Sequence, residues 1–328
     1  MANRLIWAVP TPDAHTHDQR TTRLAPSPTG ALHLGNARTF LINWAIARNA
    51  SWTIRMRIED LDTPRVKPGA ERDAIQDLEW LGLDWDDDIL TQSHHLDPYR
   101  DAMSALAARR LVYPCSLTRA EIEQVASAPN EGDPHETPYP ASLRPDDRPT
   151  TFDDADTNWR LVVPDRAITI DDAFLGPRVI TPAQSVGDFV IWTKRAQPAY
   201  QLAVVVDDAR QGVNEVVRGS DLLDSAARQT LLYDALSITD RPRYTHLPLV
   251  RGEDGRRLAK RHGDTRLSHY RDRGVPPERI IGLLARWSGL TDHREPMNAE
   301  AFRQAFSLTA LPANDVTFTK EDDLWLLS

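Results

Sequence analysis

The chain has 328 residues, of which 41% are hydrophobic and 27% charged, the ordinary balance of a globular protein with room for two or three domains. A single cysteine excludes an internal disulfide, and no apolar run is long enough for a membrane span or a signal-peptide core, so we expect a cytoplasmic protein. The net charge of −9 excludes a generally basic nucleic-acid-binding surface, although local basic clusters can still contact phosphates.

Residues 1–20 are polar and predict a loose N-terminal extension. Residues 21–25 alternate like a strand, and two prolines then keep the chain extended until Gly30 permits a turn. Apolar side chains at helical spacing follow from residue 37, with Asn36 as the expected N-cap. His33 and Gly35 therefore lie at a helix entrance, where free N–H groups attract phosphate and an imidazole can donate to it. An ordinary strand, turn and helix with a capping histidine would show the same pattern.

The next segments predict a nucleotide-binding α/β domain interrupted by an insertion. Residues 53–59 alternate as a strand, and strands and helices alternate over residues 21–110, the expected first half of that domain. Residues 111–186 are rich in turns and acidic side chains, with short strands at 159–163 and 167–170, and predict an inserted domain. Residues 187–247 should form the second half.

Two strands are expected in this second half. The sheet should resume at residues 189–193 and again at residues 202–207, where a continuous apolar run suits a parallel strand buried on both faces. Residues 248–328 predict a basic loop followed by helices at 277–287 and 299–306.

The basic loop reads Arg-Arg-Leu-Ala-Lys-Arg-His-Gly over residues 256–263, after a Gly-Glu-Asp-Gly turn. Such a charge run is commonly a solvated surface. A loop carrying Lys260 can alternatively close over a triphosphate and neutralise the charge that develops at the α-phosphorus.

These segments together resemble a known family. Residues 23–36, Arg-Leu-Ala-Pro-Ser-Pro-Thr-Gly-Ala-Leu-His-Leu-Gly-Asn, resemble the HIGH signature of class I aminoacyl-tRNA synthetases in its glutamyl form. Residues 257–261, Arg-Leu-Ala-Lys-Arg, resemble the matching KMSKS loop, and residues 57–62, 198–208 and 216–225 agree with three further motifs in family order. The resemblance implies a Rossmann-like parallel sheet split by an α+β insertion of the acceptor-binding type, followed by a mainly helical C-terminal region.

The resemblance also implies a role for individual residues. The glutamate-binding residues would be Arg23, Leu24, Ala25, Pro26, Ser27, Glu59, Tyr200 and Arg218. The ATP-binding residues would be His33, Gly35, Asn36, Arg257, Leu258 and Lys260, with His33 and Lys260 catalytic. Arginines suit the two carboxylates of glutamate and Glu59 suits its ammonium group. Taken singly, Arg218 could lie in a surface turn, Glu59 could pair with Arg57, and Tyr200 could be core packing.

The implied chemistry is in-line attack of the glutamate carboxylate on the α-phosphorus of ATP, giving glutamyl-adenylate, with Mg²⁺ accompanying ATP. Positioning and charge neutralisation would dominate the catalysis. The loop departs from the family pattern, with Arg257 in place of the first lysine and Ala259 in place of serine. Arginine keeps the charge but not the point geometry of an ammonium group.

Relatives in this family often bind zinc in the insertion through three cysteines and a tyrosine. Here Cys115 and Tyr139 match, whereas Leu117 and Leu143 stand where sulfur would be. Two ligands cannot close a tetrahedral site, so zinc is not expected, and the two leucines should pack together. His135 is the one conceivable substitute ligand, and a loop histidine there is expected to be plain surface.

The chain ends 65 residues after Gly263, whereas an anticodon-reading helical part would need roughly 100 to 150 more. The chain therefore resembles the shortened members of the family, the glutamyl-queuosine tRNA(Asp) synthetases, as do residues 218–229. This implies a monomer without an anticodon-binding domain that activates glutamate without tRNA and transfers it to queuosine at the wobble position of tRNA(Asp). The open alternatives are a compact glutamyl-tRNA synthetase, a small-molecule nucleotidyltransferase and a binding protein that has lost catalysis.

Overall fold

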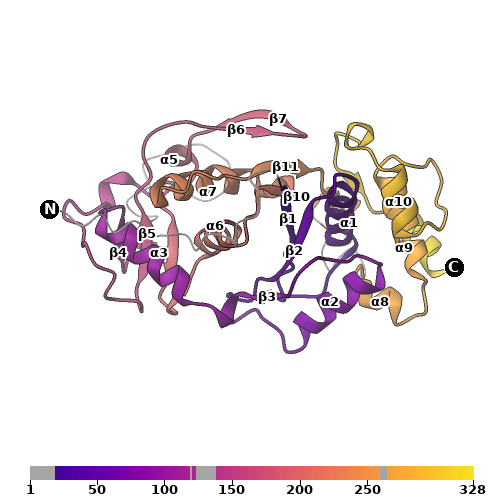
Figure 1. The fold of residues 1–328 in the computed structure, drawn as a ribbon, viewed down its shortest axis with the longest axis horizontal. Coiled ribbons are helices and arrows are strands. Elements are labelled where there is room, and N and C mark those ends of the chain that lie inside the picture. The colour runs from indigo at the N-terminus through magenta and orange to yellow at the C-terminus, as the bar shows by residue number, and fades with distance from the viewer. Residues whose placement is uncertain (1–18, 119, 123–137, 257, 259–263) are drawn as a thin grey trace.

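The computed structural model describes residues 19–118, 120–122, 138–256, 258 and 264–328. The predictions for residues 1–18, His135, Arg257, Ala259 and Lys260 lie outside these residues. Figure 1 shows parallel strands in the middle of an elongated molecule, with the C-terminal helices at one end and a separate group of strands and helices at the other. The central parallel strands thus separate the C-terminal helices from the other group of strands and helices.

The first half of the α/β domain is parallel, as predicted. Its sheet has the order β1-β2-β3, with Thr21 opposite Thr53 and Arg57 opposite Leu90. Alternating apolar residues of the second strand enter the core, as the sequence indicates. Its elements are β1 (Thr21–Leu24), α1 (Leu34–Asn49), β2 (Thr53–Ile58), α2 (Ala70–Trp80), β3 (Leu90–Thr91) and the 3-10 turn η1 (Gln92–His94).

The second half adds a sheet of order β10-β11-β6-β7. Asn214 connects this sheet to β1, because its amide N–H donates to the Thr21 carbonyl at 3.0 Å and its side chain accepts from the Thr21 N–H at 2.8 Å. The parallel strands therefore follow the order β3-β2-β1-β10-β11, a doubly wound arrangement. The elements are β10 (Glu215–Gly219), β11 (Arg243–Leu247), β6 (Ile168–Asp172), β7 (Gly176–Ile180), the turn η3 (Ser220–Leu222), and the helices α6 (Tyr200–Arg210) and α7 (Leu223–Leu236).

The strand predicted at residues 202–207 is wrong, because this segment lies inside α6. Residues 202–206 are all essentially buried, since the helix is enclosed by α3, α7 and β8. A helix buried on every side loses the apolar periodicity that distinguishes it from a buried strand.

The prediction that residues 189–193 resume the nucleotide-binding sheet is also wrong. These residues form β8 in a separate antiparallel sheet of order β4-β5-β8-β9. The predicted strand at 167–170, by contrast, joins the large sheet, where Asp172 at its end lies opposite Tyr244. Alternation identifies a strand but not its distant partner. The elements around this second sheet are α3 (Asp97–Ala108), β4 (Val112–Cys115), η2 (Ala141–Leu143), β5 (Asn158–Leu161), α5 (Pro182–Ser185), β8 (Val190–Thr193) and β9 (Gln197–Pro198).

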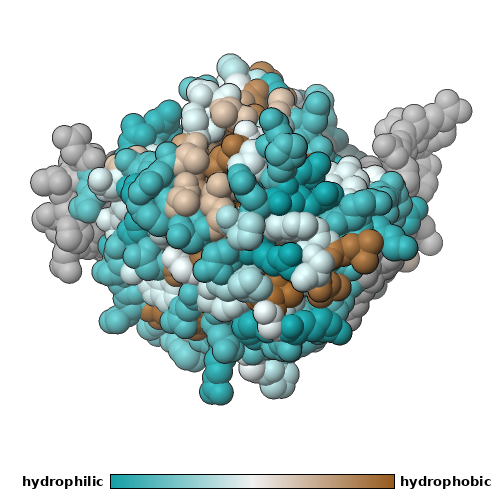
Figure 2. Space-filling view, turned by 90° about the vertical axis from the view of Figure 1, so that its right-hand side faces the viewer, coloured by the Kyte–Doolittle hydropathy of each residue, from teal (hydrophilic) through white to brown (hydrophobic). Residues whose placement is uncertain are grey.

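The C-terminal part is mainly helical, and both of its predicted helices are confirmed. Its elements are β12 (Val250–Arg251), α8 (Leu267–Arg271), α9 (Pro277–Trp287), α10 (Ala299–Ala305), η5 (Leu308–Ala310), β13 (Val316–Thr317) and α11 (Lys320–Leu327). Figure 2 shows that this end of the molecule presents a mostly hydrophilic face, with hydrophobic residues only in small groups. Over the described ranges, no helix combines the length and apolar character needed to cross a membrane.

One core joins the start of the chain to its end. Side chains of β1, α1 and β2 pack in the same buried cluster as those of α9, α10 and α11. Arg38 of α1 reinforces this contact, although its guanidinium is buried. It donates to the carbonyl oxygens of Pro248 at 2.7 Å and Trp287 at 3.2 Å and to the hydroxyl of Ser288 at 3.4 Å. The first helix is therefore fixed to the strand region before the basic loop and to the end of α9.

A small buried cluster surrounds Cys115 and Tyr139, the two residues that match the zinc ligands implied by the resemblance. Tyr113, Cys115 and Tyr139 are buried there, and Leu117 and Leu143 both pack against them. That the two leucines pack on each other stays a prediction. The Cys115 sulfur lies 3.6 Å from the Tyr139 hydroxyl. These contacts give the two leucines an apolar packing role.

Asp77 gives a test of how α2 is held to α8. Its buried carboxylate pairs with Arg271 at 2.5 Å, while the second oxygen has no hydrogen bond in the described ranges. Burial raises the pKa of Asp77 to about 6, although Arg271 partly offsets it. Because the folded pKa lies above the unfolded one, stability should fall as pH rises from about 4 to about 6.

The substitution Asp77→Asn should abolish this fall in stability with rising pH. The free energy of unfolding of the wild type, measured with urea, should fall by about 2 kcal/mol between pH 4 and pH 7, relative to that of the variant. Glu79→Gln, at an exposed position of the same helix, is the matched control. Parallel pH profiles for the wild type and Asp77→Asn would contradict the assignment.

Candidate active site

A cavity of about 580 Å³ opens at the carboxyl ends of β1, β2 and β10. It brings together most of the side chains that the sequence predicts to bind glutamate and ATP. The predicted residues that line it are Arg23, Ala25, Pro26, Ser27, His33, Gly35, Asn36, Glu59, Tyr200 and Arg218. The predicted residues Leu24 and Leu258 do not line it, because both side chains are buried in the core. A ligand site at this edge is typical of doubly wound sheets.

The turn after β1 is held against the end of β2. The Glu59 N–H donates to the Pro26 carbonyl at 3.0 Å, and the Ser27 hydroxyl donates to the Glu59 carbonyl at 3.0 Å. Because the two prolines cannot donate from their nitrogen, the turn relies on these bonds from its neighbours. The turn therefore places Arg23 and Ser27 on the same cavity as Glu59.

His33, rather than Asn36, is the N-cap of α1, so the predicted cap is wrong by one turn. The His33 Nδ1 accepts from the N–H groups of Gly35 at 3.1 Å and Asn36 at 3.4 Å, while Asn36 Oδ1 accepts from the His33 N–H. This is a capping box built with histidine and asparagine. Apolar spacing located the helix but could not locate its first residue, because Leu34 is also buried and begins the helix.

The cap fixes the tautomer of the imidazole. Since Nδ1 accepts two backbone N–H groups, the proton of a neutral His33 resides on Nε2, which can act as a donor. Gly35 makes this arrangement possible, because a Cβ atom there would lie 3.0 Å from His33 Cε1. The glycine at this position therefore makes room for the histidine ring as well as for a ligand.

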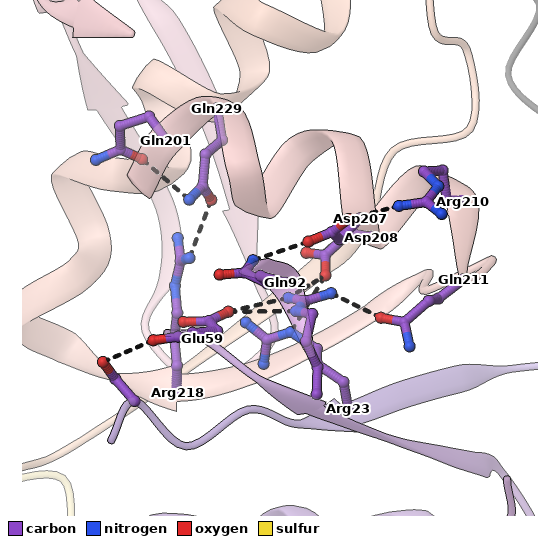
Figure 3. Close-up of polar contacts among 12 residues, drawn as sticks. Arg23, Glu59, Gln92, Gln201, Asp207, Asp208, Arg210, Gln211, Arg218 and Gln229 are labelled. Carbon is purple, nitrogen blue, oxygen red and sulfur yellow. Dashed lines mark hydrogen bonds and ion pairs between the residues drawn. The ribbon is translucent and has the colours of Figure 1, made fainter. Parts of the chain in front are cut away.

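Two buried residues that the sequence analysis did not assign to the site organise the acidic side of the cavity. Arg57 pairs with Asp208 at 2.8 Å and with Glu59 at 3.2 Å, and it donates to Gln211 at 2.9 Å. Asp208, on α6, also faces the Arg23 Nε at 3.5 Å. Figure 3 shows Asp208, Gln211 and Arg23 converging, with Glu59 drawn between Arg218 and Arg23. The sequence held one signal for such a residue, namely a charged side chain next to an apolar run, as Asp208 is in residues 198–208.

The pKa values of Glu59 and Arg57 depend on both their burial and their charged neighbours. Burial raises the pKa of Glu59, and the positive charges of Arg57 and Arg23 partly offset that effect. Burial alone would lower the pKa of Arg57, but Asp208 and Glu59 raise it further than burial lowers it. The expected alternative that Glu59 pairs with Arg57 is thus observed, and Glu59 still lines the cavity.

Arg218 is held rigidly at the opposite wall. Its Nε donates to His246 at 3.0 Å, one Nη donates to Gln229 at 2.9 Å, and the other donates to the Leu222 carbonyl at 3.2 Å. The Tyr244 ring lies 5.0 Å from the guanidinium carbon. A guanidinium has five N–H donors, so two of them have no partner within the described ranges.

Arg23 differs from Arg218 because its guanidinium makes no hydrogen bond to any described residue. Its side chain is only 7% exposed, and Asp208 is its ion-pair partner at 3.5 Å. The cavity therefore holds two buried arginines with unused donors and one carboxylate between them. This arrangement can bind a ligand that carries carboxylates and an ammonium group.

The comparisons agree with this geometry. The model of the family "tRNA synthetases class I (E and Q), catalytic domain" matches residues 19–325. The fold resembles a crystal structure of a glutamate tRNA ligase from Elizabethkingia meningosepticum, with a TM-score of 0.78 and 26% identity, covering 94% of this chain and 69% of that one. The fold and site thus define a class I tRNA synthetase catalytic domain.

Relatives with assigned names identify the group to which the chain belongs within this class. A protein of Rhodopirellula baltica named Glutamyl-Q tRNA(Asp) synthetase is 48% identical over 288 residues, which cover 82% of this chain and 84% of that protein. A protein of the same name from Symbiobacterium thermophilum is 44% identical over 91% of this chain and 96% of its own length. The chain belongs to the family of the glutamyl-Q tRNA(Asp) synthetases, which are ligases.

Proposed function

We propose that the chain activates L-glutamate with ATP to glutamyl-adenylate, without requiring tRNA. The observation that carries the proposal is the pair Arg23 and Arg218, whose unused donors flank Glu59 in one cavity. Arg23, Ser27 and Arg218 would bind the carboxylates, and Glu59 would accept from the ammonium group, with Tyr200 closing the pocket. A site built this way rejects analogues that leave its buried polar groups unpaired.

The ATP site would lie at the entrance of α1. The N-terminus of a helix attracts phosphate, and His33 Nε2 can donate to a phosphate oxygen. Class I synthetases use ATP as a substrate, and Mg²⁺ would come bound to the nucleotide, as is usual for this ion. Arg257 and Lys260, outside the described residues, would neutralise charge on the triphosphate. The protein's contribution would be position and charge rather than covalent chemistry.

The acceptor would be queuosine at the wobble position of tRNA(Asp). The names of the relatives that match over most of both chains support this acceptor. The protein would act as a cytoplasmic monomer.

Two assays test the proposal. Glutamate-dependent exchange of pyrophosphate into ATP should occur in the absence of tRNA, and no exchange would overturn the activation step. Radiolabelled glutamate should then label tRNA(Asp) that carries queuosine but neither tRNA(Asp) without queuosine nor tRNA(Glu). Label on tRNA(Glu) alone would favour a compact glutamyl-tRNA synthetase instead.

His33 allows the helix cap to be separated from the proposed phosphate contact. His33→Ala should lose about 1 kcal/mol of stability with the cap, whereas His33→Asn should keep most of it, since asparagine is a good N-cap. Both variants lack the Nε2 donor and should lower kcat for exchange about 100-fold. Thermal unfolding and exchange kinetics measure the two effects, and a wild-type kcat in His33→Ala, which has no side-chain donor, would remove His33 from the phosphate site.

A further inference from the structure

Arg218 is fixed from behind by a chain of buried side chains that does not reach the cavity. His246 of β11 accepts from the Arg218 Nε at 3.0 Å and faces Asp172 of β6 on its other side, with Nδ1 2.6 Å from Asp172 Oδ2. The side chains of His246 and Asp172 are fully buried, and neither lines the cavity. They therefore act on a ligand only through Arg218.

The hydrogen bonds fix the state of each group. The Asp172 carboxylate accepts from the backbone N–H groups of His246, Phe174 and Leu175, the closest of them at 2.8 Å. Burial raises the pKa of Asp172, but the bond to His246 and these backbone donors lower it further, so the net shift is downward and the group stays ionised. An ionised Asp172 requires the proton of His246 on Nδ1, which leaves Nε2 as the acceptor that Arg218 needs.

The geometry points to Asp172 and His246 as positioning residues that orient the Arg218 guanidinium for the substrate carboxylate, an inference that rests on the proposed glutamate activation. Asp172 sets the tautomer of the His246 imidazole. The imidazole then accepts the Nε–H of Arg218, so that the two unused N–H donors of Arg218 face the cavity. The strand β6 comes from the segment predicted as an insertion, yet it pairs with β11 at Tyr244. The insertion thereby contributes to the amino-acid site without touching it.

Substitutions at His246 test this role. His246→Leu should raise KM for glutamate about tenfold in pyrophosphate exchange, as expected for losing one hydrogen bond to a charged group. The KM for ATP should stay within about twofold, because His33 and the α1 entrance are unchanged. His246→Gln can place an oxygen near the Nε2 position and should restore most of the glutamate affinity. His95→Leu, at an exposed position, is the matched control.

Asp172→Asn supplies the second test. Its amide would favour the tautomer with the proton on Nε2, which opposes the Arg218 N–H, so KM for glutamate should rise in the wild-type background. In the His246→Gln background the same change should have little further effect, because glutamine has no tautomer to set.

The outcomes are distinguishable. A glutamine variant as impaired as the leucine variant, an equal rise in the KM for ATP, or additive effects of the Asp172 and His246 changes would overturn the positioning role. Wild-type exchange activity with an unchanged KM for glutamate in His246→Leu would overturn it while leaving the proposed function intact. A wild-type chain without exchange would overturn the proposed function and this role with it.

Discussion

Arg57→Met should lower the free energy of unfolding by about 3 to 5 kcal/mol, the usual cost of breaking a buried ion pair by removing one partner. Arg57 is fully buried, and its removal leaves Glu59 without its partner at 3.2 Å and leaves Asp208 facing only Arg23 at 3.5 Å. Urea unfolding at pH 7 measures the effect. Glutamate-dependent pyrophosphate exchange should fall as well, because Arg57 then no longer holds Glu59 directly, nor Arg23 through Asp208.

The control for this change is Arg65→Met, since Arg65 pairs with Asp62 at the surface, where its side chain is 77% exposed. That variant should stay within about 0.5 kcal/mol of the wild type. Arg57→Lys should fall between the two, because an ammonium group keeps the charge but cannot reproduce the two-sided contacts of the guanidinium. Equal stability of Arg57→Met and Arg65→Met would show that the buried cluster is not an essential part of the fold.

Arg23→Met should reduce kcat/KM for glutamate by about 100-fold or more, equivalent to one or two charge-assisted hydrogen bonds. Arg23 is the buried arginine of the cavity with the most unused donors, so a bound carboxylate would depend on it. The KM for ATP should change little, and the fold should persist because Asp208 keeps its pair with Arg57 at 2.8 Å. Pyrophosphate exchange at varied glutamate and fixed ATP measures the change.

Arg20→Met is the matched control, because Arg20 precedes the same strand and is 51% exposed beside Glu215. Its kinetics should equal those of the wild type. A loss confined to kcat, with the glutamate KM unchanged in Arg23→Met, would argue against a binding role for Arg23.

Local patterns in the sequence predicted much of this molecule. Alternation and turn chemistry gave β1 and β2, helical spacing gave α1, α9 and α10, and the motif positions gave most of the cavity lining. These features depend on neighbours in the chain, where side-chain period and backbone preference act directly.

What the sequence could not predict depends on distant partners. The burial of α6 on all sides removed its periodicity, and the pairing of β8 with β5 is not encoded in either strand alone. Arg57 and Asp208 are 151 positions apart in the chain, so their ion pair becomes visible only in the fold. The sequence analysis did not single out His246, because its role depends on contacts with Arg218 and Asp172 that only the fold creates.

The buried guanidinium of Arg38 joins the C-terminal helices to α1, the helix whose entrance is the proposed ATP site. Its acceptors are backbone and hydroxyl oxygens at residues 248, 287 and 288, and burial lowers its pKa to about 10. Removing α9 would leave this cation in the core without two of its acceptors. The helices after residue 264 are therefore not a detachable module, and a protein shortened at that point should fail to assemble its first helix.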